Sequence, residues 1–234
     1  MPRSSINPHT ANTKLASMVL GCPALLSVLN RLNIKLGFGD TTVADICQRY
    51  GLSPGVFLMI CNIYTFDTYR PNIEHLQPND IGHIVAYLRT SHRYYTGVSF
   101  PRLHANIHTL LKSCDEVSRQ VLDKFYDDYD QEVTKHFDYE ESVVFPYIDQ
   151  LLAQPQGTTH TSYRIEQFEQ NHSNIEEKLN DLKNILLKYL TESCSSPLRT
   201  EVLMSIFTLE DDLTRHTLIE ERVLAPLVAK LERQ

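Results

Sequence analysis

The chain has 234 residues, of which 42% are hydrophobic and 22% charged, and its formal net charge is −7. A chain of this length can hold one large domain, or a domain of about 150 residues with a smaller companion. The negative charge argues against a nucleic-acid surface, because such surfaces gather lysine and arginine to neutralise phosphates. The polar N-terminus lacks the apolar core of a signal peptide, and the chain has no apolar run long enough to span a membrane.

Five cysteines are scattered along the chain without a Cys-x-x-Cys motif: Cys22, Cys47, Cys61, Cys114 and Cys194. An odd, scattered set is typical of reduced thiols rather than of a disulfide framework. We therefore expect free thiols in a cytoplasmic protein. We also expect Cys22, Cys47 and Cys61 to act as small buried hydrophobic side chains.

The first third of the chain is expected to form a small helical domain. Residues 1–13 are polar and predict a disordered tail. Residues 14–66 are rich in leucine, isoleucine and valine, and breaks at Pro23, "GFGD" (37–40) and "GLSPG" (51–55) indicate three short helices. Residues 67–79 contain two prolines and no apolar periodicity, which is typical of a linker.

Residues 80–234 carry the 3.6-residue periodicity of long amphipathic helices. Breaks are expected at 96–101, around 112–115, at 153–159 and at 192–197. Long helices with short connections predict an all-α protein whose main domain is an up-down-up-down four-helix bundle.

Each apolar stripe of these helices contains one histidine: His92, His136, His172 and His216. Two of the stripes also contain a glutamate four residues after the histidine. Glu140 follows His136, and Glu220 follows His216. The polar residues interrupt the stripes near matching depths, where a metal site would lie.

The glutamates are more informative than the histidines. A single histidine in an apolar stripe is usually a hydrogen-bonded core residue, whereas burying an unpaired carboxylate costs on the order of several kcal/mol. The stripes offer no lysine or arginine to compensate Glu140 and Glu220. A bound metal cation would supply the missing positive charge.

The spacing indicates two metal ions. His92 and His136 are 44 residues apart, as are His172 and His216, and the second half repeats the first at an offset of 80. Six ligands related by a pseudo-two-fold axis fit two ions bridged by the glutamates. Nitrogen and oxygen ligands with open positions favour iron, with manganese or zinc as alternatives, and a diatomic such as O2 or NO could bind there.

Ferritin-like di-iron proteins are an alternative class, because they carry paired Glu-x-x-His motifs. That spacing occurs here at Glu169 and His172, without a second copy on a matching helix. The doubled motif is instead His-x-x-x-Glu, so this class is set aside.

Three segments, "HFDYEESVVFP", "QNHSNIEE" and "RHTLIEERVLAP", resemble those of hemerythrin-like domains. With the small helical domain ahead of the bundle, the whole chain resembles the repair-of-iron-centres family, also called iron–sulfur cluster repair di-iron proteins. The resemblance implies an oxo- or hydroxo-bridged pair of iron ions. It implies that the four histidines are terminal ligands and that the two glutamates bridge the ions. Oxygen-carrying hemerythrins use an additional histidine on the third helix, where this chain has Phe168 and Glu176.

Two positions depart from the family pattern. "YLRTSHRYY" lacks the usual tyrosine–histidine pair, so His83 or Arg89 could be aligned in place of His92, and the 44-residue symmetry decides for His92. In the N-terminal domain, "LNIKLGFGD" stands where relatives carry an adjacent cysteine pair, so a role for such thiols does not transfer.

Residues 42–60 also resemble a helix-turn-helix, which makes a transcription factor that senses NO a competing hypothesis. The would-be recognition helix, "PGVFLMICNIYTF", has no lysine, arginine, glutamine or serine with which to reach DNA. We expect it to pack against the bundle or a second subunit instead.

The residues next to the motifs receive simpler interpretations. Glu141 and Glu221 are expected to be solvated charges beside the metal-facing stripe, with a supporting role behind the metal ligands as the alternative. Pro146 and Pro226 are expected to end or kink the helices after the site.

Two hypotheses for function follow. In the first, the di-iron centre binds or reduces NO, or donates iron to damaged iron–sulfur proteins. In the second, it is a non-catalytic sensor or store in which O2 or NO shifts a partner-facing surface. A homodimer is an open alternative, and no nucleic-acid or membrane partner is expected.

Overall fold

The computed structural model describes residues 7–153, 163–171 and 175–233, and these contain helices and no strand. Within this part of the chain, no helix is both long enough and apolar enough to cross a lipid bilayer. The chain divides into two compact units. The first unit comprises the described parts of residues 1–91, 147–169 and 215–234, and the second those of residues 92–146 and 170–214.

The N-terminal segment forms four helices rather than the three expected. They are α1 (Leu15–Gly21), α2 (Leu25–Arg31), α3 (Val43–Tyr50) and α4 (Pro54–Thr65). The predicted breaks separate them, and local chemistry sets the ends of α3. Thr42 and Asp45 form a capping box at its start, and Gly51 ends it in the left-handed region at φ 64°.

Helix α4 is almost entirely buried within the first unit, as its composition predicts. Its buried residues run from Val56 to Tyr64 with Leu58 only partly covered. The backbone of His9 is hydrogen-bonded to the Asn62 side chain, with N–H to Oδ1 at 2.8 Å. The C-terminal part of the expected tail is therefore ordered against α4, while residues 1–6 lie outside the described residues.

The expected linker, residues 67–79, contains a short 3₁₀ helix, η1 (Ile73–His75), and its last two residues already belong to α5 (Pro78–Tyr94). Asn72 caps η1 by accepting a hydrogen bond from the Glu74 backbone N–H. The boundaries between an N-terminal domain, a linker and a bundle domain remain a prediction.

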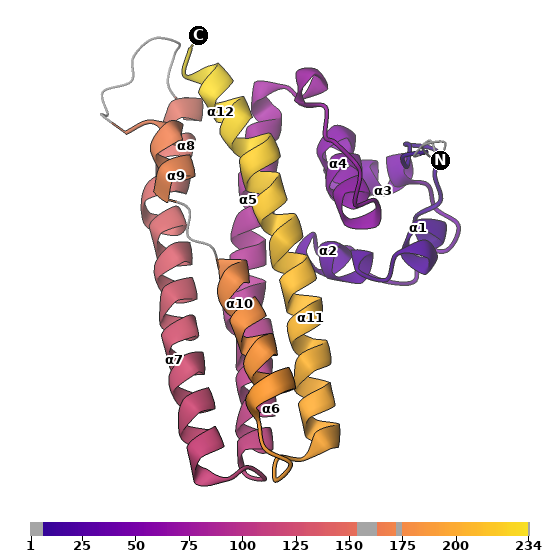
Figure 1. The fold of residues 1–234 in the computed structure, drawn as a ribbon. Coiled ribbons are helices and arrows are strands. Elements are labelled where there is room, and N and C mark those ends of the chain that lie inside the picture. Colours follow the sequence, from indigo (N-terminus) through magenta and orange to yellow (C-terminus); the bar gives the residue numbers. More distant parts are fainter. Residues whose placement is uncertain (1–6, 154–162, 172–174, 234) are drawn as a thin grey trace, which may run out of the picture. The chain divides into compact units, whose positions relative to one another are not determined.

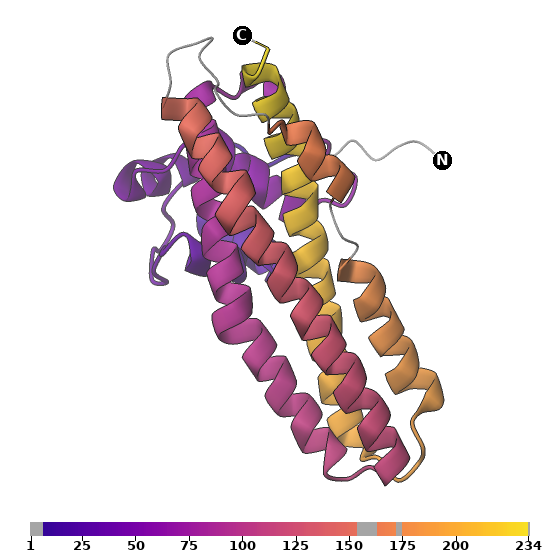
Figure 2. The same cartoon turned by 90° about the vertical axis from the view of Figure 1, so that its left-hand side faces the viewer.

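The second unit is built around four long helices that run side by side (Figures 1 and 2): α6 (Phe100–Leu111), α7 (Glu116–Tyr139), α10 (Ile175–Asn184) and α11 (Ser196–Ile219). Their inward faces supply one continuous apolar core that extends from Tyr95 to Leu213 and includes Leu122, Val133 and Leu179. The all-α helical bundle predicted from the sequence is confirmed.

The predicted breaks are only partly correct. Those around residues 112–115 and 192–197 are real turns between helices, whereas most of 153–159 lies outside the described residues. The break at 96–101 is wrong. There the chain continues as a π-helix, η2 (Tyr95–Ser99), directly into α6. The widened turn precedes Pro101, which cannot donate the next helical hydrogen bond.

The remaining elements continue or flank the long helices. They are η3 (Glu140–Val144), α8 (Phe145–Ala153), α9 (Ile165–Asn171), η4 (Ile185–Tyr189), η5 (Glu220–Leu224) and α12 (Ala225–Leu231). The segments η3, η4 and η5 are π-helices like η2.

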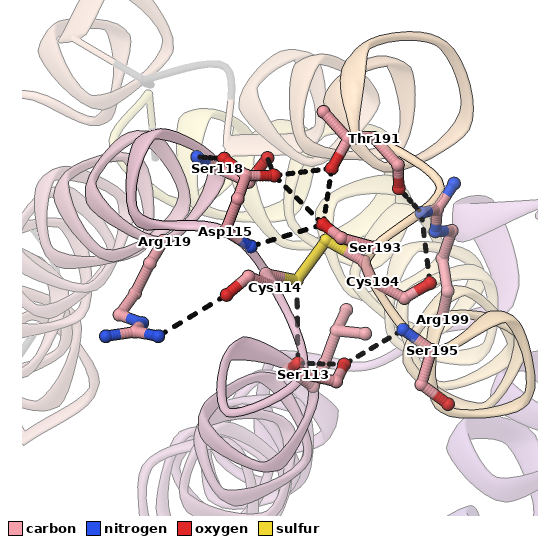
Figure 3. Close-up of a disulfide and its surroundings, with 11 residues drawn as sticks. Ser113, Cys114, Asp115, Ser118, Arg119, Thr191, Ser193, Cys194, Ser195 and Arg199 are labelled. Carbon is pink, nitrogen blue, oxygen red and sulfur yellow. Dashed lines mark hydrogen bonds between the residues drawn. A yellow bond between two sulfur atoms is a disulfide. The ribbon is translucent and has the colours of Figure 1, made fainter.

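A disulfide joins Cys114 to Cys194 across the second unit, so the expectation of reduced thiols is wrong for this pair (Figure 3). The two cysteines are 80 residues apart, the offset of the internal repeat. They occupy equivalent turns, one between α6 and α7 and the other between η4 and α11. The cysteine argument for a cytoplasmic location therefore fails, and that location stays a prediction.

The hydrogen bonds around the disulfide repeat with the same offset. The Asp115 N–H donates to Ser193 Oγ at 3.2 Å, and the Ser195 N–H donates to Ser113 Oγ at 2.9 Å. In the same way, Arg119 and Arg199 donate to the carbonyls of Cys114 and Cys194. The pseudo-two-fold axis inferred from the sequence thus passes through this turn region.

The other cysteines are reduced, as expected. Cys47 and Cys61 are buried and Cys22 is partly buried. Burial raises the pKa of the Cys47 thiol to about 11, and that of Cys61 is raised further. They pack as small apolar side chains.

Removing the disulfide should destabilise the protein. Closing a loop of this length stabilises a fold by about 4 kcal/mol on chain-entropy grounds. We expect the double variant Cys114→Ser, Cys194→Ser to lose free energy of unfolding on this order in urea titrations. Reductant should lower wild-type stability similarly and leave the double variant unaffected, with Cys61→Ser as a reductant-insensitive control for losing a thiol. Equal wild-type stability with and without reductant, at confirmed thiol release, would contradict this assignment.

Candidate metal centre

The second unit contains a buried cluster of two histidines and one glutamate. His92 lies near the end of α5, His136 lies in the last turn of α7, and Glu140 begins η3. Nε2 of His92 lies 3.0 Å from Glu140 Oε2, and Nε2 of His136 lies 3.2 Å from Glu140 Oε1. Each carboxylate oxygen therefore faces one imidazole.

The first unit contains the matching pair. His216 lies in the last turn of α11 and Glu220 begins η5. Nε2 of His216 lies 2.8 Å from Glu220 Oε1, and the two side chains are 2% and 0% exposed. The pair repeats the His136–Glu140 arrangement 80 residues later, as the sequence predicts.

Both glutamates begin a π-helix, and a proline follows six residues later in each case. The Phe145 N–H reaches back five residues to the Glu140 carbonyl, and the Ala225 N–H reaches the Glu220 carbonyl. Proline has no backbone N–H to donate the next helical hydrogen bond. A widened turn before the proline lets the helix continue without that bond. Pro146 and Pro226 therefore do not end the helices, which continue as α8 and α12.

His92 is held on several sides. Its Nδ1 lies 2.9 Å from Glu141 Oε1, an arrangement in which Nδ1–H donates and Nε2 stays available to a ligand. The rings of Phe137 and Phe145 stack on the imidazole at centroid distances of 4.3 and 5.4 Å. Glu141 therefore fits the alternative of a group behind a proposed ligand, although its side chain stays 39% exposed, whereas its counterpart Glu221 is exposed.

The geometry of these side chains fits a metal ion. Two ligand atoms that bind one ion at about 2.1 Å and at a right angle lie about 3.0 Å apart. The three imidazole–carboxylate distances of 3.0, 3.2 and 2.8 Å match this separation. Each unit thus offers buried groups able to hold a metal ion, His92 and Glu140 in the second unit and His216 and Glu220 in the first. A cation would also offset the burial of the two carboxylates.

The other expectations for the site have varied outcomes. His172 lies outside the described residues, so its role stays a prediction. His83 is exposed and lines a cavity of about 200 Å³, and Arg89 pairs with Asp149 at 2.7 Å. Of the three candidates for this helix, His92 is the buried one beside Glu140. Tyr95 is fully buried, and its hydroxyl donates to the Asp212 carbonyl, so it is part of the packed core.

Residues 83–232 match the hemerythrin HHE cation binding domain. Because the match covers more than half of the chain, the protein belongs to this family. No curated protein matches the chain. The family and the buried histidine–glutamate group together define a metal-binding protein.

The roles of Glu140 and Glu141 can be separated by substitution. We expect Glu140→Ala to abolish most metal binding, because it removes a ligand. Glu141→Ala should weaken metal binding about tenfold, because His92 loses the group that orients it. Competition titrations with a chromogenic chelator measure both.

Asp138→Ala is the matched control, because Asp138 is an exposed carboxylate between His136 and Glu140 on the same helix. It should bind metal like the wild type. Equal affinities for the Glu141 and Asp138 variants would contradict the orienting role.

Proposed function

We propose that this protein is a di-iron protein that binds NO or O2 and acts in iron–sulfur cluster repair during nitrosative and oxidative stress. The observation that carries the proposal is a pair of fully buried glutamates, each beside imidazole nitrogens at ligand-like distances, in a hemerythrin-family chain. The proposed ligands are His92, His136, Glu140, His172, His216 and Glu220, and the proposed ions are two irons.

The residues of the chain would prepare the site for such ions. Glu140 presents one oxygen to each of two imidazoles, which suits a carboxylate that bridges. Glu141 fixes the tautomer of His92, and the rings of Phe137 and Phe145 cover it from water. Iron held by nitrogen and oxygen ligands supplies open positions at which a diatomic molecule can bind.

A non-catalytic sensor is the second candidate, and one observation favours it. Arg215, next to His216, is hydrogen-bonded to the N-terminal helix α4, so a change at the ligand has a route to another part of the first unit. DNA binding through α4 is not proposed, because a recognition helix must expose side chains and those of α4 are buried.

We propose that damaged iron–sulfur proteins are the partners of this protein in the repair function. A homodimer and a cytoplasmic location remain proposals of the same kind. None of them is needed for the metal chemistry to be tested.

Metal analysis is the first test of the proposal. Protein purified without added metal should contain two irons per chain, with oxo-bridge absorption in the near ultraviolet when oxidised. The double variant Glu140→Ala, Glu220→Ala should lose both. Folded wild-type protein that binds no iron on anaerobic reconstitution would overturn the proposal.

Anaerobic addition of NO to the reduced protein then separates the two candidates. Two NO, two electrons and two protons give one nitrous oxide and one water, so NO reduction by the reduced site should yield about one nitrous oxide per chain, measured by gas chromatography. Stoichiometric NO uptake without nitrous oxide would instead favour the sensor. The Glu140→Ala, Glu220→Ala variant serves as the metal-free control for the measurements of nitrous oxide and of NO uptake.

A further inference from the structure

The residue before a proposed ligand connects that ligand's helix to the N-terminal helices of the same unit. Arg215 Nη1 donates to the carbonyl of Ile63 at 3.1 Å, and Nη2 lies 2.5 Å from Asp67 Oδ1. The Arg215 side chain is only 13% exposed. It directly precedes His216 in the last turn of α11.

The contact has a clear physical basis. Ile63 lies in the last turn of α4, where the backbone carbonyls have no partner within the helix. A guanidinium there satisfies a carbonyl and complements the negative end of the helix dipole. Asp67, just beyond the helix, adds a charge-assisted bond. One side chain therefore ties the end of α4 to the turn of α11 that carries His216.

The internal repeat shows that this link is not a general part of the histidine–glutamate motif. The position equivalent to Arg215 is Lys135, which directly precedes His136. Lys135 is exposed to solvent. The two histidine–glutamate pairs are alike, but their preceding basic residues have different surroundings.

We propose that Arg215 is a positioning residue through which the N-terminal helices regulate metal binding by the His216–Glu220 pair. The inference rests on the proposed metal function. Docking of α4 holds the last turn of α11, and with it His216, in the orientation that binds metal. Because coupling between two binding events is reciprocal, metal binding in turn strengthens the docking of α4. The metal site thereby controls how firmly the N-terminal helices are held.

A pair of matched variants tests the positioning role. Arg215→Gln and Lys135→Gln each remove one positive charge next to a proposed ligand histidine. We expect Arg215→Gln to weaken Fe(II) binding about tenfold in anaerobic competition titrations, the range seen when groups behind metal ligands are lost. Lys135→Gln should match the wild type within twofold.

Amide hydrogen exchange supplies a readout that mere loss of stability would not move. In the wild type and in Lys135→Gln, exchange of the α4 amides should slow when Fe(II) is added. In Arg215→Gln that metal-dependent slowing should be lost, while α7 amides still respond to metal. If Arg215→Gln does not fold, Asp67→Asn replaces it, because Asp67 is a surface residue that holds the same guanidinium.

The outcomes separate this inference from the function on which it rests. Wild-type protein that binds no metal would overturn the proposed function and the inference together. Metal binding that is equal in the wild type, Arg215→Gln and Lys135→Gln, with α4 exchange equally metal-sensitive in all three, would overturn the inference alone. Equal weakening by both variants would show a charge effect and would also overturn it.

Discussion

Two glutamate carboxylates, Glu140 and Glu220, are fully buried beside imidazole nitrogens, and the rest of the structure depends on how that charge is neutralised. Burying an ionised carboxylate is unfavourable by several kcal/mol unless a cation or strong donors compensate it. The helices nevertheless direct both side chains inward from π-helical turns. Such turns are common at functional sites, where a local change of pitch alters the direction of a side chain.

The internal repeat explains several features that would otherwise look unrelated. The histidine–glutamate pairs, the π-helical turns η3 and η5, and the disulfide cysteines all recur at an offset of 80 residues. The hydrogen bonds around the disulfide follow the same rule. Against this repeat, a feature found in only one half needs its own explanation. The clearest example is that Arg215 is bonded to α4, whereas the equivalent Lys135 is exposed to solvent.

Helical periodicity and the repeat were sufficient to predict the helical bundle and the burial of Glu140 and Glu220, because both depend on local spacing. The disulfide could not be predicted from the number and scatter of the cysteines, which indicate free thiols, although Cys114 and Cys194 show the repeat offset. The contact between Glu141 and His92 could not be read from the sequence, since it joins residues 49 positions apart on different helices. The π-helix at Tyr95–Ser99 resembles a break in the sequence, because glycine and proline are typical of both.

The link between α4 and α11 belongs to the same class of unpredictable features. A guanidinium that caps a distant helix depends on tertiary placement, and the sequence shows only an arginine before a histidine. Sequence reasoning did predict that α4 would be covered rather than presented to DNA, because its composition leaves few polar side chains to expose. Composition thus indicated that α4 packs against a surface but not against which one.

The most direct test of the central claim is the thermal stability of the protein before and after metal removal by a chelator. If cations neutralise the buried carboxylates, stripping them should lower the melting temperature markedly, and added Fe(II) should restore it. A variant with Glu140→Gln and Glu220→Gln, which removes the charge, should be insensitive to the chelator. An unchanged melting temperature for wild-type protein shown to have lost its metal would contradict the account.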